Sequence, residues 1–181
     1  MKSLPCVLSA ILVAGALHAA PALAELSVGA AAPDFTAEAT QGGNEFTFKL
    51  ADALKKGPVV LYFYPAAFTP GCTEEAHEFA DAMDAFHKLN ATVIGVSADG
   101  IDKLKKFSVS ECKSKFPVAA DEDKKIIKAY DTAWEKRPEL AARTSYVISP
   151  EGKVLLAHED MNPRTHVSMT MEAVKKYEAS H

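Results

Sequence analysis

The sequence predicts an α/β fold in which a central mixed β-sheet is flanked by helices on both faces. A continuous apolar run at Val59–Tyr64 is typical of a buried strand. The apolar residues that follow recur at helical spacing, and strand and helix then alternate. Near the end, the turn residues Pro150-Glu151-Gly152 separate two strand-like segments and predict a hairpin.

The individual elements follow from apolar periodicity and from turn residues. Phe46, Phe48 and Leu50 alternate with polar residues, as they do in a half-buried strand. Ala76, Phe79 and their apolar successors define one face of a helix. The expected elements are strands at 46–50, 59–64 and 92–96, helices at 72–89 and 101–115, a short segment at 117–120, a short helix at 123–130, hairpin strands at 146–148 and 154–157, and a helix at 165–177.

The first 24 residues predict a secretory signal peptide. Lys2 gives a positive start, residues 4–20 are mostly apolar, and Ala22-Leu23-Ala24 forms a small-residue cleavage site. An uncleaved membrane anchor is the alternative, but the apolar stretch is short and is interrupted by Pro5 and His18. We therefore expect an exported protein, in the periplasm of a bacterium, with no stable membrane association after cleavage.

Residues 25–181 are long enough for one well-cored domain. Removal of Lys2 with the leader leaves 19 basic and 24 acidic residues, a net charge near −5. This balance argues against nucleic acid or an anionic membrane surface as the main partner. Two cysteines remain, Cys72 and Cys112, and in an exported domain of this size they are better explained as a redox pair than as a structural staple.

Cys72 follows the buried strand 59–64 after a short turn. Thr69 is a good N-cap residue, and Pro70 suits the first position of a helix. Cys72 then lies in the first helical turn, where free N–H groups and the helix dipole favour a thiolate. An ordinary cysteine with a pKa near 8.5 is only about 3% ionised at pH 7. Because this position favours the thiolate, it indicates a reactive sulfur rather than a small buried hydrophobe.

The pattern Pro-x-x-x-Thr-x-x-Cys between a strand and a helix resembles the active site of the peroxiredoxins, and Pro65, Thr69 and Cys72 match it position by position. The segment Phe-Thr-Pro-Gly-Cys-Thr-Glu-Glu-Ala is most similar to the Q-type, or bacterioferritin-comigratory, subgroup. Residues 142–154 are similar to the family's arginine-bearing strand and the turn after it, and the whole resemblance spans residues 29–177. It implies a thioredoxin-like fold and a thiol-dependent peroxidase that reduces hydrogen peroxide and organic hydroperoxides through a sulfenic acid at Cys72.

The resemblance also implies roles for the residues around the sulfur. Arg143 would hydrogen-bond both the thiolate and the peroxide. Thr69 would offer its hydroxyl to the peroxide, although it could serve only as an N-cap. Pro65 would shield the sulfur from water or simply form the turn. Glu75 would orient Arg143, or would be a solvated acid favoured by the helix dipole. Phe68 and Trp134 are candidates for an apolar collar around the site, but core packing is the preferred account of Trp134.

The chain departs from the subgroup in the position of its second cysteine. Many Q-type members carry that cysteine five residues after the first, where this chain has His77. Cys112, on the expected helix 101–115, is instead the expected resolving cysteine. A thioredoxin-like dithiol protein is expected to reduce the resulting disulfide. The protein itself is expected to be a monomer or a dimer. If Cys112 only packs in the core, the enzyme is a one-cysteine peroxidase that needs an external thiol.

No cofactor or metal is expected, because the histidines are scattered without metal-ligand spacing. Two other classes of function fit the sequence less well. An exported thioredoxin-like disulfide oxidoreductase would use Cys-x-x-Cys, whereas Cys72 is followed by Thr73-Glu74-Glu75. A non-catalytic thioredoxin-fold binding module would be expected to have lost the cysteine or the arginine, and both are present.

Overall fold

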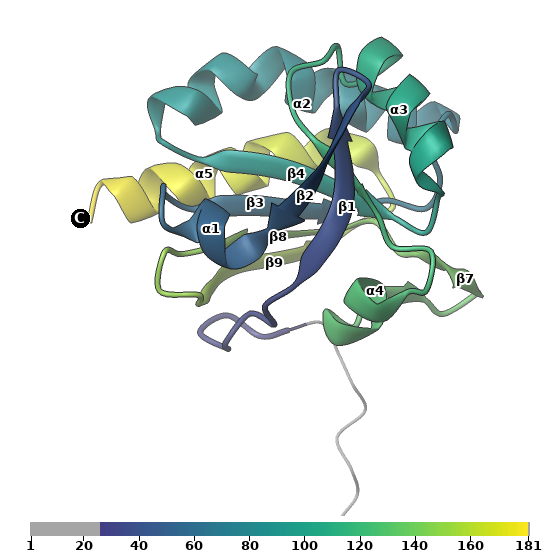
Figure 1. Cartoon of the computed structure of the whole chain (residues 1–181). Coiled ribbons are helices and arrows are strands. Elements are labelled where there is room, and N and C mark those ends of the chain that lie inside the picture. The colour runs from purple at the N-terminus through teal and green to yellow at the C-terminus, as the bar shows by residue number, and fades with distance from the viewer. Residues whose placement is uncertain (1–25, 181) are drawn as a thin grey trace, which may run out of the picture.

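The computed structural model describes residues 26–180, so the expected leader at residues 1–24 lies outside the described part, as does His181. Seven strands form one sheet in the order β2-β1-β5-β4-β3-β8-β9, with helices on both faces (Figure 1). β3 pairs in parallel with β4 and antiparallel with β8. The expected α/β fold with a central mixed sheet is therefore confirmed.

The elements have the following bounds: β1 (Thr36–Gln41), β2 (Asn44–Lys49), α1 (Leu50–Leu54), β3 (Val59–Phe63), α2 (Pro70–Lys88), β4 (Thr92–Ser97), α3 (Ile101–Ser110), β5 (Val118–Ala120), α4 (Lys125–Ala129), β6 (Ala133–Trp134), β7 (Arg137–Ala141), β8 (Thr144–Ile148), β9 (Val154–Glu159), the 3-10 turn η1 (Pro163–Thr165) and α5 (His166–Glu178).

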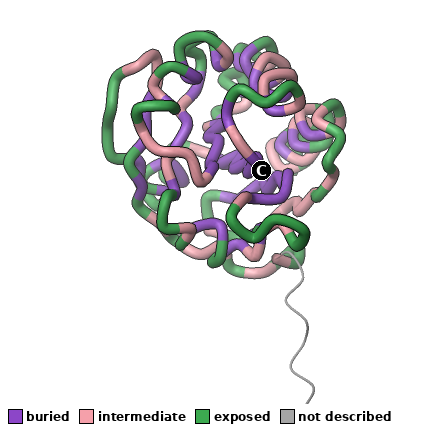
Figure 2. The backbone as a smooth tube through the Cα atoms, turned by 90° about the vertical axis from the view of Figure 1, so that its right-hand side faces the viewer, coloured by how far each residue is buried: buried purple, intermediate pink, exposed green. Residues whose placement is uncertain are grey.

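β3 lies at the centre of the sheet, and all five of its residues are buried. Leu61 and Phe63 belong to the apolar cluster that includes α1 and α4, whereas Tyr62 and Tyr64 belong to the cluster under α2, α3 and α5. Burial of Leu61 and Phe63 contributes about 1.5–3 kcal/mol each. Figure 2 shows the buried segments gathered in the interior, with exposed segments around the outside. β3 therefore holds a fixed position from which the chain enters the turn before Cys72.

Helix α3 is shorter than expected, and Cys112 does not lie on it. The helix ends at Ser110, whereas the sequence predicts a helix to residue 115. Lys113 and Ser114 have φ values of 50° and 57°, which a right-handed helix cannot contain. The Ser114 N–H donates to the Ser108 carbonyl at 2.9 Å and closes this end of the helix. The placement of Cys112 on a helix was wrong; it lies in the turn before β5.

Short elements near the edges of the fold were also missed. The expected strand 46–50 corresponds to β2, but Leu50 begins α1 instead. β1 pairs with β2 in a hairpin whose tip is Gly42-Gly43, with φ values of 57° and 81°. The two-stranded sheet of β6 and β7 was not anticipated either. Among residues 26–180, no helix is long and apolar enough to cross a membrane.

Candidate active site

Cys72 is the third residue of α2 and is 1% exposed. As the sequence predicts, Thr69 is the N-cap residue in an extended conformation and Pro70 occupies the first helical position. The first N–H groups of a helix have no intrahelical partner and carry the positive end of its dipole. The sulfur therefore lies where the backbone stabilises negative charge.

The Thr69 hydroxyl does not cap the helix. It donates to the Ala66 carbonyl at 2.9 Å, and the side chain is exposed at the start of α2. Only the Thr69 carbonyl joins the helix, by accepting from the Thr73 N–H at 2.9 Å. The hydroxyl oxygen therefore keeps lone pairs that no backbone N–H of the helix uses. Pro65, at the other end of the turn, is buried.

Asp99 fixes the turn between β3 and α2. Its Oδ2 accepts from the Ala67 N–H at 2.7 Å and from the Ser97 hydroxyl at 2.9 Å, and its Oδ1 pairs with Lys103 at 2.6 Å. The sequence analysis did not identify Asp99. The available signal was its position just after β4, because β3 and β4 are parallel and end at the same edge of the sheet.

Of the two aromatic residues proposed for a collar, only Phe68 lies in this turn. Its φ of 68° is unusual for a bulky residue. The residue is 46% exposed, and its ring packs edge-on against the Phe107 ring, with 5.3 Å between the ring centroids. Trp134 lies in the β6–β7 hairpin, is only partly buried and belongs to neither apolar cluster. Core packing was therefore the wrong expectation for Trp134.

Arg143 reaches the sulfur of Cys72. It directly precedes β8, whose first residue, Thr144, pairs with Phe63 at the end of β3. Its Nη2 donates to the Cys72 Sγ at 3.5 Å, its Nη1 to the Glu75 carboxylate, and its Nε to the Met161 carbonyl at 3.2 Å. Burial alone would lower the pKa of this guanidinium, but Glu75 and Cys72 outweigh burial and raise it. The group is a held cation aimed at the sulfur.

Glu75 is fully buried one helical turn after Cys72, so it is not a solvated helix-terminal acid. Burial raises the pKa of this carboxyl, and the Arg143 guanidinium opposes the rise. A buried charge needs a partner, and each of these two groups supplies the other's. Glu75 therefore fixes one edge of the guanidinium while another edge faces the sulfur.

Gly71 leaves the space that Arg143 needs. A Cβ atom at this position would lie 3.0 Å from the Arg143 Nη2, which is closer than an ordinary van der Waals contact. Because that Nη2 is the atom that contacts the sulfur, a larger residue would displace the guanidinium from Cys72. The absence of a side chain at Gly71 thus allows Arg143 to contact Cys72.

Cys112 is a free, fully buried thiol in the same apolar cluster as Cys72. Burial raises the pKa of Cys112 far above its usual range, so the thiol stays protonated in the folded chain. The adjacent Glu111 pairs with His77 on α2 at 2.8 Å, and Lys113 pairs with Asp81 on the same helix at 2.5 Å. His77, which stands where the subgroup has its second cysteine, thus joins α2 to the turn that carries Cys112.

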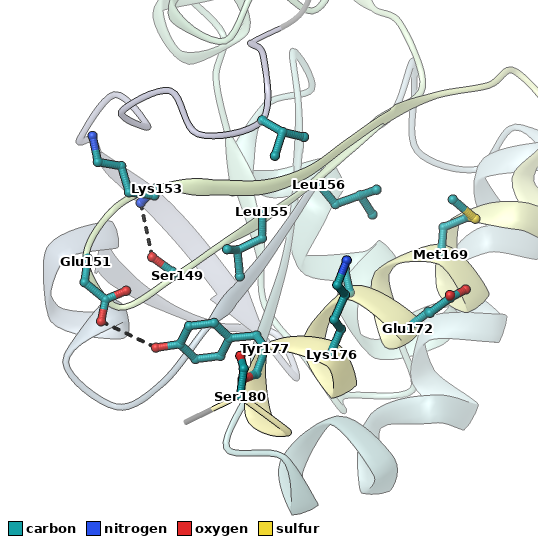
Figure 3. Close-up of a pocket in the computed structure, with 12 residues that line it drawn as sticks. Ser149, Glu151, Lys153, Leu155, Leu156, Met169, Glu172, Lys176, Tyr177 and Ser180 are labelled. Atoms are coloured by element: carbon teal, nitrogen blue, oxygen red, sulfur yellow. Dashed lines mark hydrogen bonds between the residues drawn. The ribbon is translucent and has the colours of Figure 1, made fainter.

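A cavity of about 750 Å³ lies apart from these residues, between β9 and α5 (Figure 3). Leu155, Leu156 and Met169 line it, and the Tyr177 hydroxyl donates to Glu151 at 3.4 Å at one end. None of the residues around Cys72 belongs to its lining. Within residues 26–180, no three His, Cys, Asp or Glu side chains are grouped closely enough to hold a metal ion.

Comparisons with known proteins agree with this geometry. The profile of the AhpC/TSA family matches residues 28–157. The peroxiredoxin Bcp of Bacillus subtilis is 31% identical over 156 residues, which cover 83% of this chain and 96% of that protein. The chloroplastic peroxiredoxin Q of Oryza sativa subsp. japonica is 34% identical over 152 residues, which cover 83% of this chain and 68% of that protein.

Solved structures show the same likeness. Peroxidoxin BcpB from Mycobacterium tuberculosis superimposes with a TM-score of 0.75 at 28% identity, covering 82% of this chain and 96% of that one. A cysteine-to-serine mutant of PrxQ from Xylella fastidiosa gives a TM-score of 0.76 at 25% identity, covering 85% of this chain and 98% of that one. The mixed central sheet with flanking helices thus matches peroxiredoxin structures.

Proposed function

Because this chain belongs to the AhpC/TSA family of peroxiredoxins, with a thioredoxin-like fold and thiol-dependent peroxidase activity, we propose that Cys72 is the sulfur that reduces the peroxide. Its thiolate attacks one oxygen of the hydroperoxide, the O–O bond breaks, and Cys72 becomes a sulfenic acid. The other oxygen takes a proton and leaves as water or alcohol. The observation that carries this proposal is the Arg143 Nη2 at 3.5 Å from a sulfur in the first turn of a helix.

The neighbouring residues receive matching roles. Arg143 stabilises the thiolate and the charge that develops on the leaving oxygen. Glu75 holds the guanidinium in that position, as its burial against Arg143 supports. Thr69 offers its exposed hydroxyl to the peroxide, and the buried Pro65 keeps water from the sulfur.

For the second half of the cycle, Cys112 is the resolving cysteine. Its sulfur attacks the Cys72 sulfenic acid, a disulfide forms and water leaves; a thioredoxin-like dithiol protein then reduces the disulfide. The membership of both cysteines in one apolar cluster supports this pairing. A disulfide requires Cα atoms within about 7 Å of each other. Movement of the turn that carries Cys112 would bring its Cα atom within this distance of Cys72. The alternative is a one-cysteine cycle with an external thiol.

Substitution of Cys72 by Ser tests the first half of the cycle. A hydroxyl is far less ionised than a thiol at neutral pH, so Cys72→Ser should lose essentially all peroxide consumption with dithiothreitol as reductant while keeping the wild-type circular dichroism spectrum. Mass spectrometry of the wild type after one equivalent of peroxide should find the new oxygen or disulfide at Cys72. Wild-type turnover by the serine variant would end the proposal.

Export is a separate proposal, supported by the charged start, apolar stretch and cleavage site of the leader. The family match begins at residue 28, after the leader. N-terminal sequencing of protein purified from its native cells should give Glu25 as the first residue, in a periplasmic fraction. A cytoplasmic protein that begins at Met1 would contradict export but would leave the peroxidase chemistry untouched.

A further inference from the structure

A buried histidine, His166, lies behind the proposed site as the first residue of α5. Its Nε2 is 2.8 Å from the Asp160 carbonyl oxygen, and its Nδ1 is 2.8 Å from the Ser145 hydroxyl. A carbonyl oxygen can only accept, so Nε2 carries the hydrogen. Nδ1 then accepts from Ser145, and the neutral ring uses both of its nitrogens.

His166 touches both structures that hold Arg143. On one side, its Nδ1 lies 3.7 Å from the Glu75 Oε1, and the other oxygen of that carboxylate accepts from Arg143. On the other side, its Nε2 holds the carbonyl of Asp160. The Asp160 N–H donates to the Arg143 carbonyl at 3.2 Å, and the next residue, Met161, accepts from the Arg143 Nε at 3.2 Å. The imidazole thus holds the main-chain segment that contacts the guanidinium on one side, and it lies against the Glu75 carboxylate on the other.

We propose that His166 is a positioning residue of the peroxidase reaction, which keeps Arg143 aimed at Cys72 by holding the Asp160–Met161 segment in place, with its neutral ring beside Glu75. The inference rests on the proposed function, because it assigns His166 a role through Arg143. If His166 only filled space in the core, it would need no hydrogen bond to the segment that contacts Arg143. An aliphatic side chain could then pack in its place equally well.

The ring's neutrality is part of this role. A protonated imidazole would be a second cation beside Glu75 and would compete with Arg143 for that carboxylate. The titratable and charged groups near the ring are Glu75 from α2, Arg143 just before β8, Asp160 just after β9, and His158 from β9, whose ring centroid lies 4.8 Å away. Burial lowers the pKa of His166 to about 4, so at neutral pH the site contains one held cation rather than two.

The test compares three substitutions of His166 with a control on the same helix. His166→Gln can keep an N–H donor near the Nε2 position, His166→Asn keeps a polar group only near Nδ1, and His166→Leu keeps neither. Val174→Ala removes buried volume from α5 without touching the network. For each we would measure the rate of peroxide consumption, the pH midpoint of Cys72 alkylation by peptide mass spectrometry, and the urea midpoint of unfolding.

We expect His166→Leu and His166→Asn to react about ten-fold more slowly at pH 7, because a small misplacement of a catalytic group is costly, and to alkylate with a higher pH midpoint. His166→Gln should recover most of both. Val174→Ala should lose stability and keep the wild-type rate and midpoint. A His166→Leu protein with the wild-type rate and midpoint would show that the ring is only structural. If that protein does not fold, equal rates and midpoints for Gln and Asn overturn the proposal. If the wild type consumes no peroxide, the proposed function fails, while the alkylation midpoints still decide the role of His166.

Discussion

At Arg143, one side chain donates to three residues, two of them on α2 and one in the segment before η1. The guanidinium is planar, so the directions of its N–H groups are fixed relative to one another. Glu75 and the Met161 carbonyl therefore determine where the remaining Nη2 points, and it points at the Cys72 sulfur. The contact depends on the shape of the guanidinium as well as on its charge.

Removal of this group should slow the reaction by about 10²- to 10³-fold, as loss of one preorganised donor to a developing negative charge does in other enzymes. Arg143→Ala should also raise the pH midpoint of Cys72 alkylation. Arg143→Lys keeps a charge, but its N–H groups all lie on one nitrogen and cannot replace Nε, Nη1 and Nη2 in their separate positions, so it should resemble the alanine variant in rate. Stopped-flow oxidation by hydrogen peroxide gives the rate.

Arg164→Ala is the matched control for these variants. Arg164 is 73% exposed and pairs with Glu74, the residue next to Glu75, at 2.7 Å. Its removal should leave both the rate and the alkylation midpoint unchanged. If Arg143→Ala behaves like Arg164→Ala, Arg143 has no part in the chemistry.

The sequence reveals these site residues unequally. Cys72, Thr69 and Pro65 lie within eight residues of one another, so a local motif contains them. The burial of Glu75 could not be predicted, because it depends on Arg143, which arrives from another strand. His166 was counted among scattered histidines, because its partners meet it only after the chain has folded.

At the scale of elements, the site joins the start of α2 to the turn that follows α3. Two ion pairs, His77 with Glu111 and Lys113 with Asp81, hold that turn on α2. At least one member of each pair is substantially exposed, and water and salt screen such pairs, so they stabilise the contact only weakly. Detachment of the turn is therefore opposed mainly by the burial of its apolar side chains.

We predict that residues 71–75 and 111–116 both loosen when Cys72 is oxidised. Amide hydrogen exchange should rise by about ten-fold or more in these two segments after one equivalent of peroxide, and the centre of the sheet should stay protected. Cys112→Ser should form no internal disulfide, so its sulfenic acid should persist and should be over-oxidised readily to the sulfinic acid by further peroxide. Normal turnover of Cys112→Ser with a dithiol protein would show that Cys112 only packs and that the cycle uses one cysteine.

The length of α3 shows why such turns escape prediction. Apolar residues continue to recur after Ser110, and the segment contains no glycine or proline to signal an end. The helix nevertheless stops, because two non-glycine residues, Lys113 and Ser114, adopt the left-handed conformation. That choice depends on tertiary contacts of the turn, including the pair between Lys113 and Asp81.

For the whole molecule, the layers were predictable because they depend on apolar side chains that repeat over many residues. The alternation along β3 serves two clusters, one on each face of the sheet, and α2 has a continuous apolar face. The β6–β7 hairpin was not predictable, because most of its residues are exposed and its strands are short. Hydrophobic periodicity thus specifies the core but not the edges.

The buried, neutral His166 should also make the stability of the whole molecule depend on pH. The unfolded chain binds a proton on this ring near pH 6.5, whereas burial lowers the pKa in the folded chain to about 4. Between these values the unfolded state binds more protons, so the free energy of unfolding falls as the pH falls. The loss should amount to about 3 kcal/mol when the pH is lowered from above 6.5 to below 4.

Urea unfolding at pH 7, 5.5 and 4 would measure this dependence as the difference between the wild type and His166→Gln, which cannot take up the proton. The wild type should lose about 3 kcal/mol more than the glutamine variant over this range, because the carboxylates that also titrate there are common to both. His87→Gln, a substitution of an exposed histidine on α2, should follow the wild type at every pH. Parallel curves for the wild type and His166→Gln would mean that folding does not lower the pKa of this ring, which would contradict the buried, neutral imidazole proposed beside Glu75.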